Sequence, residues 1–562
     1  MDLKRTPYEF HRQIESPSHF ARREWKALLF CGGALMAALC AVILLIDPAF
    51  FYPRISSDPL NYILKAQSLV ERGTLEVAWA VNLRPFSYVA MPGLLRAPAV
   101  MGFQEFDQQL RAMQLMNVPI LVSLAALSAY VFSWVLPPER HRLAIVFAFG
   151  FTLLSPIWLA NVFLPLADAP YAVFTLVTIL LAVELLCSDK PLAQRPLLLV
   201  LFALTFAMSF MLRFTAPVLM LFIAPLARTR LKGSSQSRAR LRLFFILMFV
   251  AVAVLVALNA NTIFGRYFNE PIFFLRRAEK SGILLNLFGA AFPTQILPTF
   301  QLGFVHPPVV EQVKTSFSST IPDMAWALVG CAISAIILAG MWIGRRPLKP
   351  ELLYVVGALP VLALMMPSTT RYLMPYQPFY WIFFYVGAST LVTRHAPWLA
   401  RLARSRRVMW AGIAAVAAIV VGLRAWKSAG TASERYHVVT LNSVPAYHNE
   451  VTSTFRSLRN YLETLPRERT LLIGGAGAAG RWKVISDLDY YAADSALPGV
   501  TAEKDVYLVV ECGTLDACQA WDIYGTRLQA RILKHAPVRF DSVFAVGSPR
   551  ARAKVLRVRA IN

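Results

Sequence analysis

Five ionisable side chains lie in or beside long apolar runs of the sequence, where a charge is costly: Asp58, Arg84, Asp168, Arg213 and Arg371. A carboxylate held at the start of a helix stays ionised and can accept a proton. A guanidinium presents a planar fork of donors that suits a phosphate. Two carboxylates and three guanidiniums therefore predict a site for an anionic lipid headgroup and a partner that carries a hydroxyl group.

Three of these residues also have a structural interpretation. Asp58 precedes Pro59, a preferred arrangement at the start of a helix, and this pattern alone favours a helix cap. Leu60 and Ile63 then belong to the apolar face of a helix lying on the membrane surface. Asp168 could be a second cap, and Arg84 could anchor the apolar run after it by reaching towards water. An ionisable group this close to hydrocarbon is nevertheless a candidate for function.

The elements that must position these residues follow from composition. Of 562 residues, 57% are hydrophobic and 16% are charged, whereas soluble domains carry about 25% charged residues. The mean hydropathy is +0.52. Apolar runs of roughly 20 residues recur, which is the length that crosses a bilayer. The sequence predicts a polytopic membrane protein and excludes disordered, collagen-like, coiled-coil and small disulfide-rich classes.

Eleven spans are predicted, with the N-terminus in the cytoplasm and the C-terminus outside. The first is an uncleaved span rather than a signal peptide. Residues 197–227 are expected to cross twice, turning near Arg213, because the loops on both sides of them are basic. The spans are 27–46, 114–136, 143–162, 169–187, two within 197–227, 243–264, 324–343, 351–366, 375–393 and 408–424.

The basic residues support this orientation. The formal net charge is +24, and the predicted cytoplasmic segments hold 24 of the 56 Lys and Arg residues. The three short outer turns hold only Arg213 and Arg371. Basic residues beside spans set orientation and meet anionic lipid, so this charge does not indicate nucleic-acid binding. All five candidate residues then fall on the outer face.

Two domains are predicted: residues 1–424 form the membrane domain, with long outer segments at 47–113 and 265–323, and residues 425–562 form a small α/β domain outside the membrane. In this tail the alternating patterns predict strands at 470–475, 505–512, 542–547 and 554–561 and helices at 449–464 and 516–533.

Two further features of the tail leave alternatives open. Cys512 and Cys518 could form a local disulfide in an oxidising compartment. Gly475, Gly477 and Gly480 formally match a dinucleotide fingerprint. A single match of this kind is weak, and the glycines are interpreted as a tight turn from a strand into a helix. The domain is expected to bind glycan or to contact a partner.

Four motifs in register resemble the GT-C superfamily of glycosyltransferases, which includes the protein O-mannosyltransferases and the lipid A aminoarabinose transferases. The likeness covers residues 27–424. Arg84 and Phe86 replace a lysine and a proline of the family pattern, and the first outer segment lacks the paired acids of some relatives, which weakens the case for a metal. The motifs are Asp58 with Tyr62, Ala66, Leu69 and Gly73; Arg84-Pro85; Asp168-Ala169-Pro170; and Arg371-Tyr372 with Pro375 and Pro378.

This resemblance implies inverting transfer of a sugar from a polyprenyl-phosphate donor to an acceptor hydroxyl on a glycan, lipid or protein. Asp58 is the expected base. Arg84 and Arg371, with Arg213 third, are expected to hold the charge of the leaving phosphate. Asp168 would orient sugar hydroxyls or position an arginine. Tyr62 and Tyr372 complete the expected substrate site, no cofactor is expected, and the expected location is the bacterial inner membrane.

Two other functions remain open. Polymerases or ligases of lipid-linked glycans work on the same face through outer arginines and a histidine, for which His306, His437 or His448 could serve. A flippase or transporter of lipid-linked sugars would need ionisable residues in the middle of its helices. The predicted spans are nearly free of these, so transport is the weaker alternative.

Overall fold

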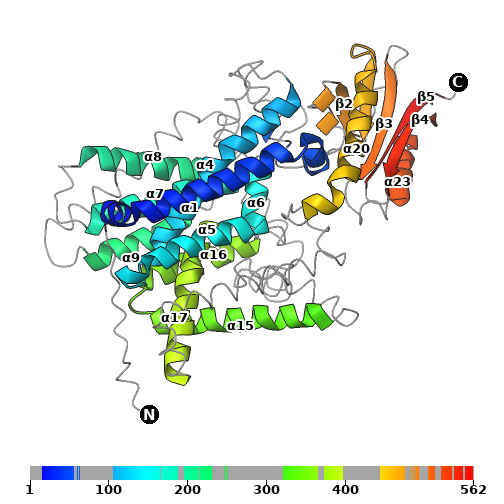
Figure 1. Ribbon diagram of the computed structural model, residues 1–562. Coiled ribbons are helices and arrows are strands. Elements are labelled where there is room, and N and C mark those ends of the chain that lie inside the picture. Colours follow the sequence, from blue (N-terminus) through cyan, green and yellow to red (C-terminus); the bar gives the residue numbers. More distant parts are fainter. Residues whose placement is uncertain are drawn as a thin grey trace.

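A computed structural model shows a helical membrane part followed by a five-stranded sheet with its own helices (Figure 1). The structure describes residues 16–55, 60, 62–63, 105–164, 166–187, 195–213, 216–230, 246, 250, 321–364, 373–395, 443–474, 481–482, 485–486, 488–492, 504–512, 521–534, 537–548 and 551–560. The helices of the membrane part are α1 (Pro17–Leu45), η1 (Pro48–Arg54), α4 (Phe106–Ser133), η2 (Pro138–Arg140), α5 (His141–Leu154), α6 (Pro156–Phe163), α7 (Asp168–Cys187), α8 (Pro196–Leu212), η4 (Ala216–Leu219), α9 (Met220–Arg230), α15 (Ile321–Gly344), α16 (Lys349–Leu364) and α17 (Gln377–His395).

The described helices bear out the membrane prediction in part. Three helical stretches are long and apolar enough to cross a bilayer: Pro17–Leu45, Phe106–Ser133 and Asp168–Leu186. Shorter apolar helices occupy other predicted spans, α8 and α9 among them. The count of eleven stays a prediction, because 408–424 and most of 243–264 lie outside the described residues.

Polar contacts at the two ends of the bundle show that its helices alternate in direction. Arg142 of α5 lies 3.4 Å from Glu24 of α1, and Arg195 donates to the Glu184 carbonyl at 3.2 Å, so these residues mark one end of the bundle. We call it the opposite end, meaning the end opposite the sheet domain. At the other end, Gln114 of α4 donates to a carbonyl at the end of α6 at 3.0 Å. We call this the domain-side end, because η1 meets the sheet domain there (Figure 1).

The pair of short helices expected between 197 and 227 is confirmed. Helix α8 ends at Leu212, η4 forms the turn, and α9 ends at Arg230. Both α8 and α9 pack against α7, so the chain reverses between them. The turn with Arg213 therefore lies at the end of the bundle where α7 begins.

One predicted span is wrong in detail. Residues 143–162 were expected to form a single helix, whereas the structure breaks them into α5 and α6 between Leu154 and Pro156. Proline lacks the amide hydrogen and crowds the preceding turn. Ser155 adopts an extended conformation, and Pro156 starts the new helix, where its missing donor costs nothing.

Helices α15 and α17 approach closely through two glycines. A Cβ atom added to Gly340 would lie 1.8 Å from the Phe383 carbonyl oxygen, and one added to Gly387 would lie 2.1 Å from the Ile336 carbonyl oxygen. Small residues permit such backbone contact between membrane helices. This contact fixes α17, whose first turn contributes to the candidate site.

The tail is an α/β domain, as predicted. Its sheet has the order β2-β1-β3-β5-β4, in which β1 pairs in parallel with β2 and β3, and β5 pairs antiparallel with β3 and β4. The short strand β2 was not predicted from the sequence. The elements are α20 (Ser443–Glu463), β1 (Thr470–Gly474), β2 (Asp489–Ala492), β3 (Asp505–Cys512), α23 (Trp521–Leu533), β4 (Val538–Ser548) and β5 (Ala551–Ala560).

Strand alternation gives the sheet two apolar faces. Leu508 and Val510 of β3 belong to one apolar cluster with Leu528 and Ile532 of α23. Val509 belongs to the other cluster, which contains residues of α20 and continues into the membrane helices. The α20 face of the sheet is therefore part of the same core as the helical bundle.

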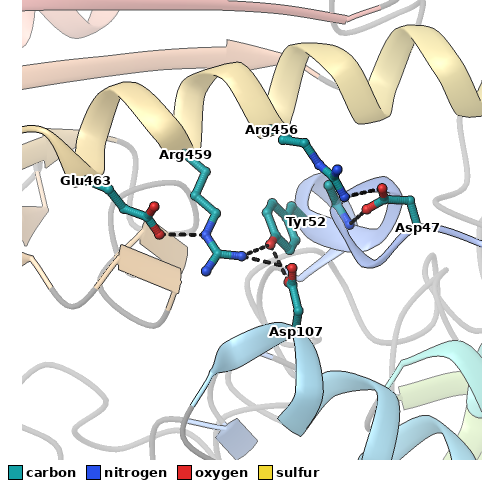
Figure 2. A network of polar contacts seen from close by, with 7 residues as sticks. Asp47, Tyr52, Asp107, Arg456, Arg459 and Glu463 are labelled. Atoms are coloured by element: carbon teal, nitrogen blue, oxygen red, sulfur yellow. Dashed lines mark hydrogen bonds and ion pairs between the residues drawn. The ribbon is translucent and has the colours of Figure 1, made fainter.

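A polar network joins α20 to the bundle (Figure 2). Arg459 donates to the Tyr52 hydroxyl at 2.8 Å and to Asp107 at 2.9 Å, and its Nε donates to Glu463 at 2.7 Å. Nearby, Arg456 pairs with Asp47. Burial and then the charge of Asp107 raise the pKa of the Tyr52 hydroxyl, so it stays a proton donor to that carboxylate.

Cysteine labelling tests the orientation of the two ends. Cys512 is disulfide-bonded, and disulfides persist in oxidising compartments, so we expect the domain-side end to be extracytoplasmic. Ser453 on α20 and Ser18 on α1 are both exposed and lie at different ends. In a background where every cysteine except Cys512 and Cys518 is alanine, Ser453→Cys should react with an impermeant maleimide in intact cells.

Ser18→Cys is the matched control and should react only after permeabilisation. The reverse labelling pattern would contradict the predicted orientation and place the candidate residues on the cytoplasmic face.

Candidate functional site

Asp168 begins α7 at the domain-side end of the bundle. Its carboxylate is 1% exposed and lies at the helix N-terminus, where the helix dipole favours a negative charge. The next residue, Ala169, donates its amide hydrogen to the Asn161 side-chain oxygen at 3.1 Å. The turn between α6 and α7 is thus fixed by a side chain, with a buried carboxylate at its end.

Arg213 meets this carboxylate from α8. It follows the last residue of the helix in an extended conformation, its amide bonds the Ser209 carbonyl at 3.1 Å, and its side chain is 4% exposed. Its Nη2 donates to Asp168 Oδ1 at 2.5 Å. The sequence placed both residues on one face, and the structure brings them into contact as a buried ion pair.

Asn161 also connects this pair to a later part of the chain. Its Nδ2 donates to the Met374 sulfur at 3.4 Å. Trp158, one turn earlier on α6, donates its indole hydrogen to Gln377, the first residue of α17. Residues 373–377, which directly follow Arg371 and Tyr372 in the chain, therefore pack beside Asp168.

Four buried tyrosines extend the polar character of this region. Tyr171 lies one turn after Asp168 and hydrogen-bonds Tyr376 through its side chain. The Tyr354 ring of α16 lies 4.7 Å from that of Tyr376, measured between centroids, and Tyr380 lies one turn further along α17. These tyrosines were not predicted as site residues, because tyrosine within an apolar run has the same hydropathy pattern as ordinary core.

The first outer segment is described in part. Tyr62, a predicted substrate residue, is fully buried. Leu60 and Ile63 are also buried and belong to the protein core, so their predicted place on the membrane surface is wrong. An amphipathic pattern specifies an apolar face but not whether protein or lipid covers it.

The other predicted site residues lie outside the described residues: Asp58, Arg84, Arg371 and Tyr372. The same holds for the glycine run 475–480, which separates β1 from the helical residues Arg481 and Trp482. Within the described part of the chain, His, Cys, Asp and Glu side chains form no group of three or more that could hold a metal ion.

Comparison with known proteins gives structural neighbours only. No family model matches the chain, and no curated protein sequence matches it. The chain is similar to the crystal structure of ArnT from Cupriavidus metallidurans bound to undecaprenyl phosphate, with 13% identity and a TM-score of 0.50 over 93% of this chain and 97% of that one.

A second similar structure is the oligosaccharyltransferase of Archaeoglobus fulgidus in the apo form, with 11% identity, a TM-score of 0.48 and coverage of 91% of this chain and 73% of that one. The likeness to ArnT spans almost the whole of both chains, tail included. The fold expected from the resemblance is confirmed: the chain has the fold of ArnT.

Proposed function

We propose that the protein is an integral-membrane glycosyltransferase that moves a sugar from a polyprenyl-phosphate donor to an acceptor hydroxyl on the extracytoplasmic face, with inversion. One observation carries the proposal: the buried Asp168–Arg213 pair lies at one end of the bundle beside the segment that follows Arg371. The likeness to a protein crystallised with undecaprenyl phosphate supports a lipid-phosphate donor.

The chemistry needs a base and a place for negative charge. The acceptor oxygen forms a bond to the anomeric carbon as the bond from that carbon to the phosphate oxygen breaks, and a single displacement inverts the centre. Asp58 takes the acceptor proton, an assistance that contributes about 10²–10⁴-fold. The leaving phosphate is a weak base, so stabilising its charge matters more than protonating it.

The arginines are proposed to supply that stabilisation. Arg84 and Arg371 present forks of donors to the phosphate. Arg213 is engaged by Asp168 at 2.5 Å, which supports the role of Asp168 in positioning an arginine rather than in binding sugar hydroxyls. A buried, oriented pair keeps this side of the site ordered before the donor arrives.

An assay of sugar transfer tests the proposed function directly. Purified protein in lipid nanodiscs, given undecaprenyl-phosphate-linked radiolabelled sugars and membrane glycan acceptors, should release undecaprenyl phosphate and label the acceptor. Consumption of a diphosphate-linked oligosaccharide instead would favour a polymerase or ligase.

The Asp58→Asn variant distinguishes the two possible roles of Asp58, general base and helix N-cap. Asparagine caps a helix about as well as aspartate but cannot take the proton. Transfer should fall at least about 100-fold with an unchanged unfolding temperature. Asp541→Asn, which removes a surface charge of β4 far along the chain, is the matched control and should keep full transfer. Substantial transfer by the Asp58 variant would reject the mechanism.

Arg371→Ala should weaken binding of undecaprenyl phosphate by roughly 10- to 100-fold, as expected for loss of a charge-assisted hydrogen bond. Arg84→Ala should do the same, and lysine at either position should restore only part because it lacks the fork. Arg394→Ala removes an exposed arginine in the last turn of α17 and serves as the control. Native mass spectrometry of the lipid complex measures the affinity, and wild-type affinity in both alanine variants would return these residues to membrane anchoring.

Double substitution tests what the buried pair contributes. Asp168→Ala or Arg213→Met alone breaks a buried ion pair and should cost about 3–5 kcal/mol of stability. The double variant removes both charges and should recover most of the unfolding temperature. Transfer should stay low, because the ordered arginine is still missing. Recovery of transfer along with stability would show that the pair is structural only.

A further inference from the structure

The sheet domain holds the backbone of the first outer segment through one buried arginine. Arg481 donates from Nε to the Ile55 carbonyl at 3.0 Å and from Nη1 to Glu511 at 2.6 Å. The Arg481 and Glu511 side chains are 7% and 4% exposed. A charge-assisted bond in such a dry place is stronger than one in water.

Glu511 fixes the direction in which Arg481 points. One carboxylate oxygen accepts from Arg481 and the other accepts from the Trp482 indole at 2.6 Å. Burial raises the pKa of Glu511, whereas Arg481 and Trp482 act in the opposite direction. With both oxygens engaged, the guanidinium keeps one orientation and aims its Nε at the carbonyl.

The Arg481–Glu511 contact lies at the carboxyl ends of the parallel strands. Arg481 follows the glycine run after β1, and Glu511 lies at the carboxyl end of β3, the parallel neighbour of β1. In open α/β sheets, the crevice at the carboxyl ends of the strands is where ligands bind. Here the chain segment ending in Ile55 contacts that edge.

Aromatic packing also holds the segment that contains Tyr52 and Ile55. The Trp482 ring meets Tyr52 of η1 edge-on at 6.1 Å between centroids and stacks on Phe455 of α20 at 6.2 Å. Tyr52 and Ile55 are fully buried. The backbone at Ile55 is therefore a fixed point against the sheet domain, and the chain continues from there to Asp58.

Asp58 lies three residues after this fixed point and two residues before Leu60, which is buried in the core. We propose that Arg481 is a positioning residue, which rests on the proposed function: by holding the Ile55 carbonyl it sets the place of the Asp58 carboxylate relative to the acceptor. A displacement of about 1 Å at a reacting group can cost about 100-fold in rate.

Arg481→Ala should lower kcat at least about 10-fold while the KM for the donor stays within about twofold, because the base moves and the phosphate-binding arginines do not. Arg481→Lys provides one donor group in place of a fork, cannot serve Ile55 and Glu511 in the same geometry, and should recover kcat in part. In hydrogen-exchange mass spectrometry, peptides covering 48–55 should exchange faster in Arg481→Ala, and peptides covering 521–533 should not.

Two matched arginine variants distinguish positioning of the first outer segment from a general weakening of the contact between the sheet domain and the bundle. Arg459→Ala removes contacts to Tyr52 and Asp107 without touching Ile55, and should lower the unfolding temperature with kcat largely kept. Arg557→Ala breaks a pair with Asp505 inside the sheet domain and should leave kcat unchanged.

Wild-type kcat or unchanged exchange of 48–55 in Arg481→Ala overturns the inference, as does an equal loss of kcat in Arg459→Ala. Full activity of Asp58→Asn instead contradicts the proposed function, and the exchange measurement still reports whether Arg481 restrains the segment.

Discussion

A charge placed at the end of an apolar helix bundle needs a partner, and the Asp168–Arg213 pair meets this need. Both side chains are almost completely buried, and their contact joins the start of α7 to the end of α8. Breaking a buried ion pair is costly, so the turns on both sides are constrained to keep the contact. Asn161 then ties the same turn to Met374, which brings the start of α17 to this end of the bundle. The geometry of the candidate site depends on this one contact.

The sheet domain docks on the bundle through side-chain hydrogen bonds and a shared apolar core. Arg459 and Arg481 reach from the domain to Asp107 and to the Ile55 carbonyl, and both contacts fall on or beside η1. The apolar cluster under α20 is continuous with that of the membrane helices. Separating the domain would expose apolar surface and strand polar groups together, so the two parts behave as one folded unit.

Many of the strands and helices were predictable from the sequence. Strand alternation specified β1, β3, β4 and β5, and basic loops specified two short helices between 197 and 227, because periodicity and charge act locally. The partner of Asp168 was not predictable, since Arg213 is 45 residues away in sequence and the contact depends on packing between two turns. Strand β2 has four residues and gave too short a pattern, and averaging hydropathy across Pro156 hid the break between α5 and α6.

The role of Arg481 was hidden for a different reason. The glycines before it match a dinucleotide fingerprint, and that match directs attention to a small-molecule ligand instead of to the arginine that follows. In the structure Arg481 donates to the Ile55 carbonyl, and Glu511 near the carboxyl end of β3 holds the arginine in place. A displacement reaction needs its base and its phosphate-binding groups fixed independently, because they act on opposite sides of the reacting carbon. The helical bundle holds the Asp168–Arg213 pair, and the sheet domain holds the Ile55 carbonyl three residues before the proposed base, so we propose that each folded part contributes a different half of the chemistry.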